Sequence, residues 1–121
     1  MAKKSKATSR PRQNLKKEVY WLVKQIPEGK VATYGQIAKK FQISNFKFQI
    51  DPRMIGWMLH QNKDPDVPCH RVVDRNGRIA VNFGFGGAPE QRQRLLSEGV
   101  KFIDEMHVDL AKCLWREDPK S

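Results

Sequence analysis

The sequence predicts a mainly α-helical fold with a small β-hairpin, built as a single domain. Four segments carry apolar residues at helical spacing, and three of them begin at a residue type that caps helices. A short β-branched run is followed by an Asn-Gly turn, a common signal of a hairpin. A chain of 121 residues can bury one modest core but not two.

Composition divides the chain into three parts. Residues 1–13 contain Lys, Arg, Ser and Pro without an apolar period, which predicts a disordered basic arm. Residues 14–116 are expected to form the folded domain, and residues 117–121 a C-terminal tail. The chain has 23 Lys and Arg against 13 Asp and Glu, a formal net charge of +10, and half of this excess lies in the arm. This charge favours a polyanion, most simply nucleic acid, as the partner.

The lack of long apolar runs and the spacing of the cysteines indicate the cellular compartment. No run approaches the roughly 20 apolar residues of a membrane span, and the N-terminus lacks the apolar stretch of a signal peptide. Cys69 and Cys113 match no metal or redox spacing, so both are expected to be free thiols. We therefore expect an intracellular protein of the cytoplasm or nucleoid, or of the nucleus in a eukaryote, without membrane contact.

The first two helices are defined by their caps. Asn14 can cap a helix that Pro27 and Gly29 bring to an end. After the turn at 27–30, Thr33 can cap a shorter helix. The expected buried faces are Leu15, Val19, Leu22, Val23 and Ile26 in the first helix and Tyr34, Ile37, Ala38 and Phe41 in the second.

A third helix is expected after residues 43–50, which lack a period and predict a loop. Asp51 can cap this helix, and Pro52 suits its first position. The second and third helices, joined by a compact linker in a basic chain, have the outline of a helix-turn-helix. With the hairpin as its wing, the fold class is a winged helix-turn-helix-like single domain.

The hairpin is expected around the turn that ends in Asn76 and Gly77. Residues 71–73 are β-branched and would form its first strand. Residues 79–81 would return as its second strand.

A glycine-rich loop over 82–87 leads into the last helix, which opens at Ala88 and Pro89. Gly99 stands where a C′ glycine ends a helix. Residues 100–115 are expected to pack a short strand or turn against the core. The expected anchors are Leu110, Leu114 and Trp115, and Cys113 is interpreted as a buried structural thiol.

Cys69 and His70 are the residues that suggest chemistry. A thiol attacks as its thiolate, and a neighbouring base or cation lowers its pKa toward neutrality. The segment Pro-Cys-His-Arg-Val-Val at 68–73 therefore raises the hypothesis of a covalent step. The alternative is a packed thiol beside a surface imidazole, and the dipeptide alone leaves both open.

Two motifs and their order resemble the C-terminal domain of the O6-alkylguanine-DNA alkyltransferases. The motifs are Gly-Lys-Val-Ala-Thr-Tyr-Gly-Gln-Ile-Ala at 29–38 and Pro-Cys-His-Arg-Val-Val at 68–73, followed by Gly-Gly and a helix ending in Glu-Gly. The resemblance runs from Glu18 to Ile103 and implies a DNA repair protein that needs no metal or cofactor. Its partner would be double-stranded DNA containing O6-alkylguanine, bound by a monomer.

The resemblance implies direct and irreversible reversal of damage by an enzyme that acts once. Cys69 would attack the alkyl carbon on guanine O6 and keep the alkyl group. His70 would take the thiol proton through a water, and Glu98 would orient the imidazole. Asn62 would link the turn to the active-site segment.

Further positions of the family pattern imply contacts with DNA. Tyr34 would rotate the target phosphate and donate a hydrogen bond to the base. Arg53 would fill the gap left by the flipped nucleotide. Gly56 and Arg71 are also assigned to DNA contact. The alkylguanine pocket is assigned to Tyr34, Val72, Phe83 and Phe85, with core packing as an equal alternative for the two phenylalanines.

Three features depart from the family pattern. We expect no part of this sequence to form the family's N-terminal ribonuclease-H-like domain. Trp57 follows Gly56 on a helix that usually carries small residues, and we expect it to pack inward as core. The lead-in to the Gly-Gly pair, at 82–85, is longer than usual.

This loop, the run at 90–94 and the ending at 98–100 resemble the alkyltransferase-like proteins. Those relatives bind and flip O6-alkylguanine, lack the reactive cysteine and signal to excision repair. A non-catalytic lesion sensor with nucleotide excision repair proteins as partners is therefore the second hypothesis, although Cys69 is present here. The third is an ordinary winged-helix DNA-binding module without lesion chemistry.

Overall fold

The computed structural model describes residues 14–44 and 49–116. The basic arm, the C-terminal tail and residues 45–48 of the loop expected at 43–50 lie outside the described residues, and residues 43 and 44 are helical instead of belonging to that loop. None of the helices within the described ranges is long and apolar enough to cross a membrane. In chain order the elements are α2 (Leu15–Lys24), β1 (Ala32–Thr33), α3 (Tyr34–Ser44), α4 (Pro52–His60), the 3-10 helix η1 (Cys69–Arg71), β2 (Val72–Val73), α5 (Gly87–Ser97) and α6 (Leu110–Cys113).

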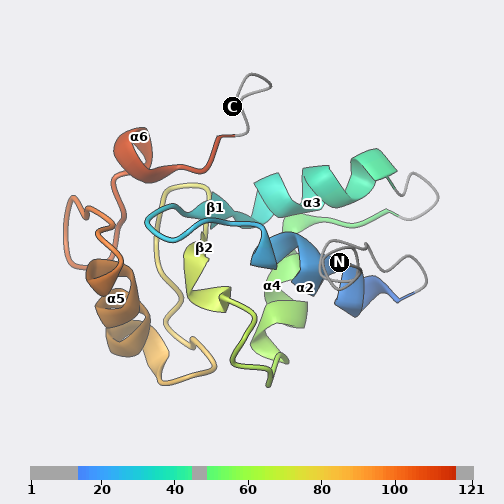
Figure 1. Ribbon diagram of the computed structural model, residues 1–121, viewed down its shortest axis with the longest axis horizontal. Helices are drawn as coiled ribbons and strands as arrows, with labels where there is room; N and C mark the ends of the chain where they lie inside the picture. Colours follow the sequence, from blue (N-terminus) through green and yellow to red (C-terminus); the bar gives the residue numbers. More distant parts are fainter. Residues whose placement is uncertain (1–13, 45–48, 117–121) are drawn as a thin grey trace, which may run out of the picture.

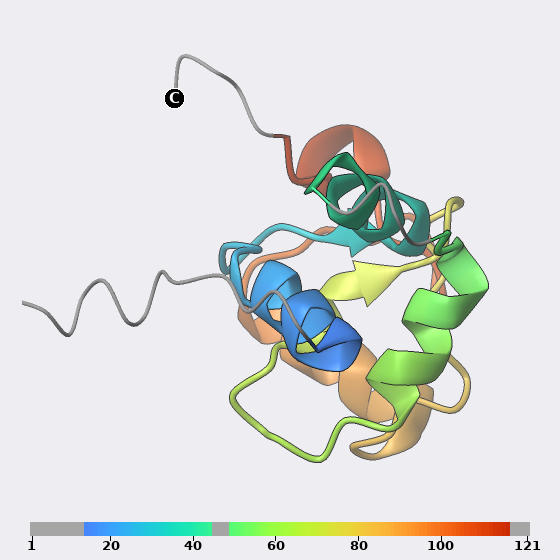
Figure 2. The ribbon, with the colours of Figure 1, turned by 90° about the vertical axis from the view of Figure 1, so that its right-hand side faces the viewer.

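The short sheet divides the core in two. Figures 1 and 2 show α2, α3 and α4 on one side of β1 and β2, with α5 on the other. Successive side chains of a strand point to opposite faces. Ala32 and Val72 therefore join the cluster around Phe41, whereas their neighbours Val31 and Val73 join the cluster against α5. The predicted fold class, a mainly helical domain with little β structure, is confirmed, with a two-stranded sheet in place of the expected hairpin.

The starts of three helices are confirmed as predicted from their capping residues. Asn14 and Asp51 cap α2 and α4 through their side chains. At the start of α3, Thr33 Oγ1 accepts from the Gln36 amide at 3.0 Å, and Gln36 Oε1 accepts from the Thr33 amide at 3.2 Å. This pair is a capping box. Gln36 Nε2 also donates to the Trp115 carbonyl at 2.7 Å, which ties the C-terminal segment to α3.

The predicted hairpin is wrong in its pairing. β2 pairs in parallel with β1, with Ala32 opposite Val72. A parallel pair needs a long crossover, which here contains α3 and α4. The turn after β2 does form, closed by a hydrogen bond of 2.9 Å from the Gly77 amide to the Asp74 carbonyl.

The segment after this turn finds other partners. The Ile79 amide donates to the Met106 carbonyl at 2.9 Å. The Ala80 amide donates to the Gln91 side chain at 2.7 Å. Because these donors are already used, residues 79–81 do not form the returning strand of a hairpin.

Residues 100–115 pack against the core, as predicted: Val100, Val108 and Cys113 join the cluster beside α5, whereas Trp115 joins the cluster around Phe41. The Trp115 amide donates to the Val31 carbonyl at 2.7 Å, and the Val31 amide donates to the Cys113 carbonyl at 2.9 Å. Cys113 is buried, and its sulfur accepts a hydrogen bond of 3.3 Å from the Lys101 amide. This thiol is therefore part of the packing, in agreement with the interpretation from sequence.

Gly77→Ala is expected to destabilise the fold more than Gly99→Ala. The two glycines have φ of +85° and +88°, where an alanine costs about 1–2 kcal/mol. A Cβ at Gly77 would also lie 2.6 Å from the Val108 carbonyl oxygen, whereas nothing lies within 4 Å of a Cβ at Gly99. In urea unfolding we expect a loss of about 1 kcal/mol for Gly99→Ala and about 3 kcal/mol for Gly77→Ala. Equal losses would contradict this packing of the turn.

Candidate functional site

A surface groove opens onto a small cavity beside α4. The groove has a volume of about 680 Å³, and its lining includes Arg53, Trp57 and Arg75. The cavity has a volume of about 40 Å³, room for only a few water molecules, and its lining includes Cys69 and Phe83. The residues that line both are Tyr34, Gly56, His60 and Asn82.

Cys69 lies in the wall of the cavity, at the start of η1. Asn62 Nδ2 donates to its sulfur at 3.3 Å, and the sulfur lies 3.9 Å from the Leu59 carbonyl oxygen. Burial raises the pKa of Cys69 to about 11, against the opposing effects of the Asn62 hydrogen bond and the Arg94 charge. The thiol is therefore protonated at neutral pH and needs a base before it can attack.

Asn62 joins the segment after α4 to the segment that carries the thiol. Besides its bond to Cys69, its Nδ2 donates to the Asp64 carbonyl at 2.9 Å. Its Oδ1 accepts from the Asp64 amide at 3.1 Å. One buried amide thus shapes the turn and fixes its distance from the sulfur.

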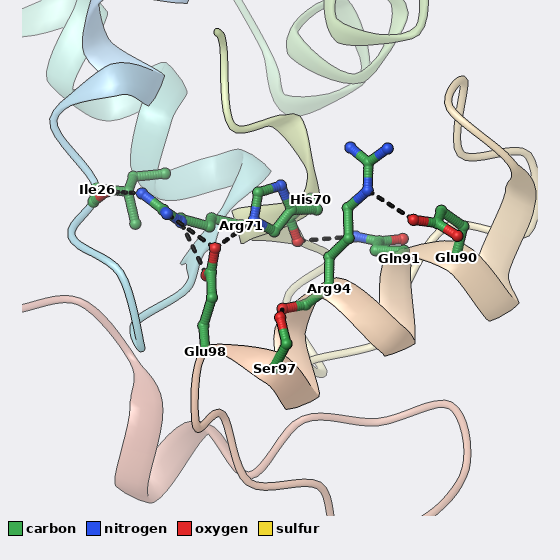
Figure 3. Close-up of polar contacts among 8 residues, drawn as sticks. All are labelled: Ile26, His70, Arg71, Glu90, Gln91, Arg94, Ser97 and Glu98. Atoms are coloured by element: carbon green, nitrogen blue, oxygen red, sulfur yellow. Dashed lines mark hydrogen bonds and ion pairs between the residues drawn. The ribbon is translucent and has the colours of Figure 1, made fainter. Parts of the chain in front are cut away.

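Glu98, the residue after α5, brings His70 and Arg71 to one carboxylate (Figure 3). His70 Nε2 lies 2.8 Å from Oε2. Arg71 donates through Nε to Oε1 at 2.9 Å and through Nη2 to Oε2 at 2.8 Å. Arg71 Nη1 donates to the Ile26 carbonyl at 2.8 Å. The network joins η1, the end of α5 and the chain just after α2.

This placement gives no support to the DNA contact expected for Arg71. Its guanidinium is bound by Glu98 and Ile26, and its side chain is only 17% exposed. Arg71 also lies outside the lining of the groove. Its position makes it an internal partner of Glu98 instead.

The charge states of His70 and Glu98 suit a base and its orienting carboxylate. Burial lowers the pKa of His70, although the Glu98 hydrogen bond opposes this effect. Burial would raise the pKa of Glu98, but hydrogen bonds from Arg71 and His70 outweigh it and hold that pKa below its usual range. At neutral pH a neutral imidazole therefore donates Nε2–H to an ionised carboxylate. Its Nδ1 lone pair is left to accept a proton.

Two side chains of α4 are exposed to the groove. Arg53, in the first turn, has a side chain that is 94% exposed, and its guanidinium lies 4.0 Å from the Asp51 carboxylate. Trp57, one turn later, is 61% exposed. The expectation that Trp57 packs inward is wrong, because Ile55, Met58 and Leu59 fill the buried side of this helix.

Tyr34, the first residue of α3, faces Gly56 of α4. A Cβ at Gly56 would lie 3.7 Å from the tyrosine ring, so the small residue leaves room beside the ring. Burial raises the pKa of Tyr34, and the charges of Asp74 and Cys69 raise it further. The phenol therefore keeps its proton and can act as a hydrogen-bond donor.

The expected pocket residues divide into lining and support. Val72 and Phe83 line the cavity, together with Tyr34. Phe85 lies outside the lining and packs on Phe83, with their ring centroids 5.9 Å apart. The Arg94 guanidinium lies 5.4 Å from the centroid of each of these two rings.

Gln91 is a site residue that sequence reasoning missed. It is 1% exposed and lines the cavity. Its Nε2 donates to the carbonyls of His70 at 3.1 Å and Val72 at 3.2 Å, while its Oε1 accepts from Ala80. The signal was its position four residues before the buried Leu95, which places it on the apolar face of α5.

A family model matches most of the described chain. It is the DNA-binding domain of 6-O-methylguanine DNA methyltransferase, and it matches residues 14–100. The matched range contains every residue of the thiol and carboxylate network described above.

Two proteins with similar sequences show which kinds of protein this chain resembles. Alkyltransferase-like protein 1 of Schizosaccharomyces pombe is 32% identical over 103 residues, which cover 82% of this chain and 92% of the relative. A methylated-DNA--protein-cysteine methyltransferase of Thermococcus gammatolerans is 41% identical over 83 residues, which cover 67% of this chain and 41% of the relative. The chain thus spans almost the whole of the first relative and less than half of the second.

A solved structure has the same fold. It is that of S. pombe Atl1 in complex with damaged DNA containing O6-carboxymethylguanine. Its TM-score is 0.71 at 29% sequence identity, over 88% of this chain and 99% of that chain.

Glu98→Gln is expected to lower the free energy of unfolding by about 2 kcal/mol, because it leaves the half-buried Arg71 guanidinium without its anionic partner. The matched control is Glu90→Gln, which removes the more exposed partner of Arg94. That change should cost only about 0.5 kcal/mol. Chemical denaturation at pH 7 measures both losses. A loss for Glu98→Gln as small as that of the control would contradict a structural role for the network.

Proposed function

Because the chain belongs to the 6-O-methylguanine DNA methyltransferase family, we propose that it binds duplex DNA, flips O6-alkylguanine and transfers the alkyl group to Cys69. One observation carries the proposal. The buried thiol lies in a cavity beneath a groove, next in sequence to a neutral imidazole that is held by a carboxylate. These are the parts of an activated nucleophile.

Binding would use the exposed side of α4 and the start of α3. Arg53 would enter the stack where the nucleotide leaves, and Gly56 would let the helix approach the DNA closely. Tyr34 would donate a hydrogen bond to the flipped base. The net charge of +10 supports a phosphate-rich partner.

In the proposed reaction the Cys69 sulfur forms a bond to the alkyl carbon while the bond between that carbon and O6 breaks. The electron pair of the broken bond goes to the guanine, which takes up the proton that the thiol gave up. His70 Nδ1 would accept this proton first. Within the described contacts His70 and Cys69 share no direct hydrogen bond, so a bridging water is required in this scheme. Glu98 would stabilise the imidazolium that forms.

The cavity must widen before a base can reach the sulfur, since its 40 Å³ holds only water. The loop over 82–87 supplies Asn82, Phe83 and Gly84 to the lining. We propose that this loop moves with Phe83 and Phe85 when the base enters. Substrate binding and activation of the thiol would then occur together.

A second function is favoured by a different observation. The solved structure with the same fold, at a TM-score of 0.71, is S. pombe Atl1 bound to DNA that contains O6-carboxymethylguanine, and the 32% identical sequence relative from that organism is an alkyltransferase-like protein. In this alternative the chain flips the lesion and presents it to nucleotide excision repair proteins, and Cys69 only lines the pocket. The high pKa of Cys69 is compatible with an unreactive thiol.

Intact mass measurement decides between transfer and sensing. Incubation with a duplex that contains O6-methylguanine should add one methyl group per protein. Cys69→Ser should abolish the gain, whereas Cys113→Ser should retain it, because Cys113 is buried in the second core. Tight binding without a gain in mass would support the sensor.

The transfer rate should depend on pH through His70. Only the neutral imidazole accepts the thiol proton, and burial lowers the pKa of His70 from 6.5. The single-turnover rate should therefore be constant near pH 8 and fall at acid pH with a midpoint below pH 6.5. His70→Gln should slow transfer by about 100-fold and remove this step. A midpoint above 6.5, or an unchanged rate in the variant, would contradict His70 as the base.

A further inference from the structure

Trp57 is a large apolar side chain exposed in the groove. A single exposed apolar residue is common on protein surfaces and needs no explanation by itself. Trp57 differs because it lies one turn after Arg53 on the side of α4 that faces the groove. Any ligand of the groove would therefore meet the indole.

The charges around the indole favour a polyanion that carries flat rings. Lys16 Nζ lies 5.9 Å from the ring centroid of Trp57. Arg53 and Arg75 line the same groove, and Asp74 is the one acid among the described residues that line it. Proteins that bind unpaired nucleic acid combine a basic groove with an aromatic stacking surface in this way.

An indole ring stacks on the flat face of a base, but fully paired DNA exposes only the edges of its bases in the grooves. Faces become available where bases are unpaired or unstacked. The four residue steps from Arg53 to Trp57 span about 6 Å along a helix, less than two base steps of about 3.4 Å. If Arg53 fills the gap left by a flipped nucleotide, Trp57 reaches a base beside that gap.

We propose that Trp57 is a specificity-determining residue that stacks on an unstacked base next to the extruded nucleotide. The proposal rests on the proposed function, because it places the lesion at Arg53. Stacking offsets the cost of disrupting the neighbouring pair, and that cost is smallest where the pair is already weak. The protein should therefore prefer lesions beside a mismatch to lesions in a fully paired duplex.

The test uses the full chain with Cys69→Ser, so that binding is measured without transfer. Three DNA probes carry one O6-methylguanine: a paired duplex, the same duplex with a mismatch in the adjacent pair, and the single strand. Trp57→Ala should weaken binding to the mismatched and single-stranded probes by about 5- to 100-fold, with little change on the paired duplex. Trp57→Phe should restore most of the affinity, because its ring still stacks.

One control variant and one fluorescence measurement complete the experiment. Ile103→Ala changes a side chain that is 65% exposed and lies outside the groove, and it should leave all three affinities unchanged. The mismatched probe should also quench tryptophan fluorescence in the parent protein, and Trp57→Phe should remove this quenching.

The possible outcomes separate the two proposals. Equal losses on all three probes would overturn the stacking role and indicate contact with sugar and phosphate. Unchanged affinities would also overturn the stacking role and would indicate that Trp57 contacts a protein partner instead. Failure of the parent protein to distinguish O6-methylguanine from guanine would count against the proposed function alone. Mismatched probes with guanine would then still decide the role of Trp57.

Discussion

The carboxylate of Glu98 is the constraint on which the rest of the site depends. It accepts hydrogen bonds from His70 and Arg71, and Arg71 continues to the carbonyl of Ile26. Three segments far apart in the sequence meet at this point. Removing such charges from water is unfavourable unless every hydrogen bond is made. The same hydrogen bonds therefore orient the imidazole and hold the packed helices in place.

The two-residue strands control where the thiol lies. Because adjacent side chains face opposite ways, Val72 belongs to the core beside the cavity and Val73 to the core beside α5. The backbone just before them, which carries Cys69, is held between these cores. Gln91 adds bonds to the carbonyls of His70 and Val72 from α5. The main effect of this short sheet is therefore to hold η1 in a fixed position.

Local features could be read from the sequence, and long-range ones could not. Thr33, Asp51 and Gly99 set helix ends through neighbours within a few residues, so their roles followed from residue type. The hairpin failed because the partner of Ile79 is Met106, which no turn signal identifies. The motif identified the site residues, but the bond between Arg71 and Glu98 joins segments far apart in the sequence, which no local pattern predicts. Trp57 was misjudged because its bulk suggests burial, whereas the buried face of α4 was already filled.

The narrow cavity has a consequence for how long the protein keeps its function. Oxidants attack thiolates that they can reach, and a thiol that is both protonated and enclosed is resistant to them. Cys69 is protonated at neutral pH, with a pKa of about 11, and its 40 Å³ cavity excludes oxidants much larger than water. A protein that is proposed to react only once loses its function when the sulfur of Cys69 is oxidised. The narrow resting site would thus limit the loss of reactive thiol to oxidation before the protein meets a lesion.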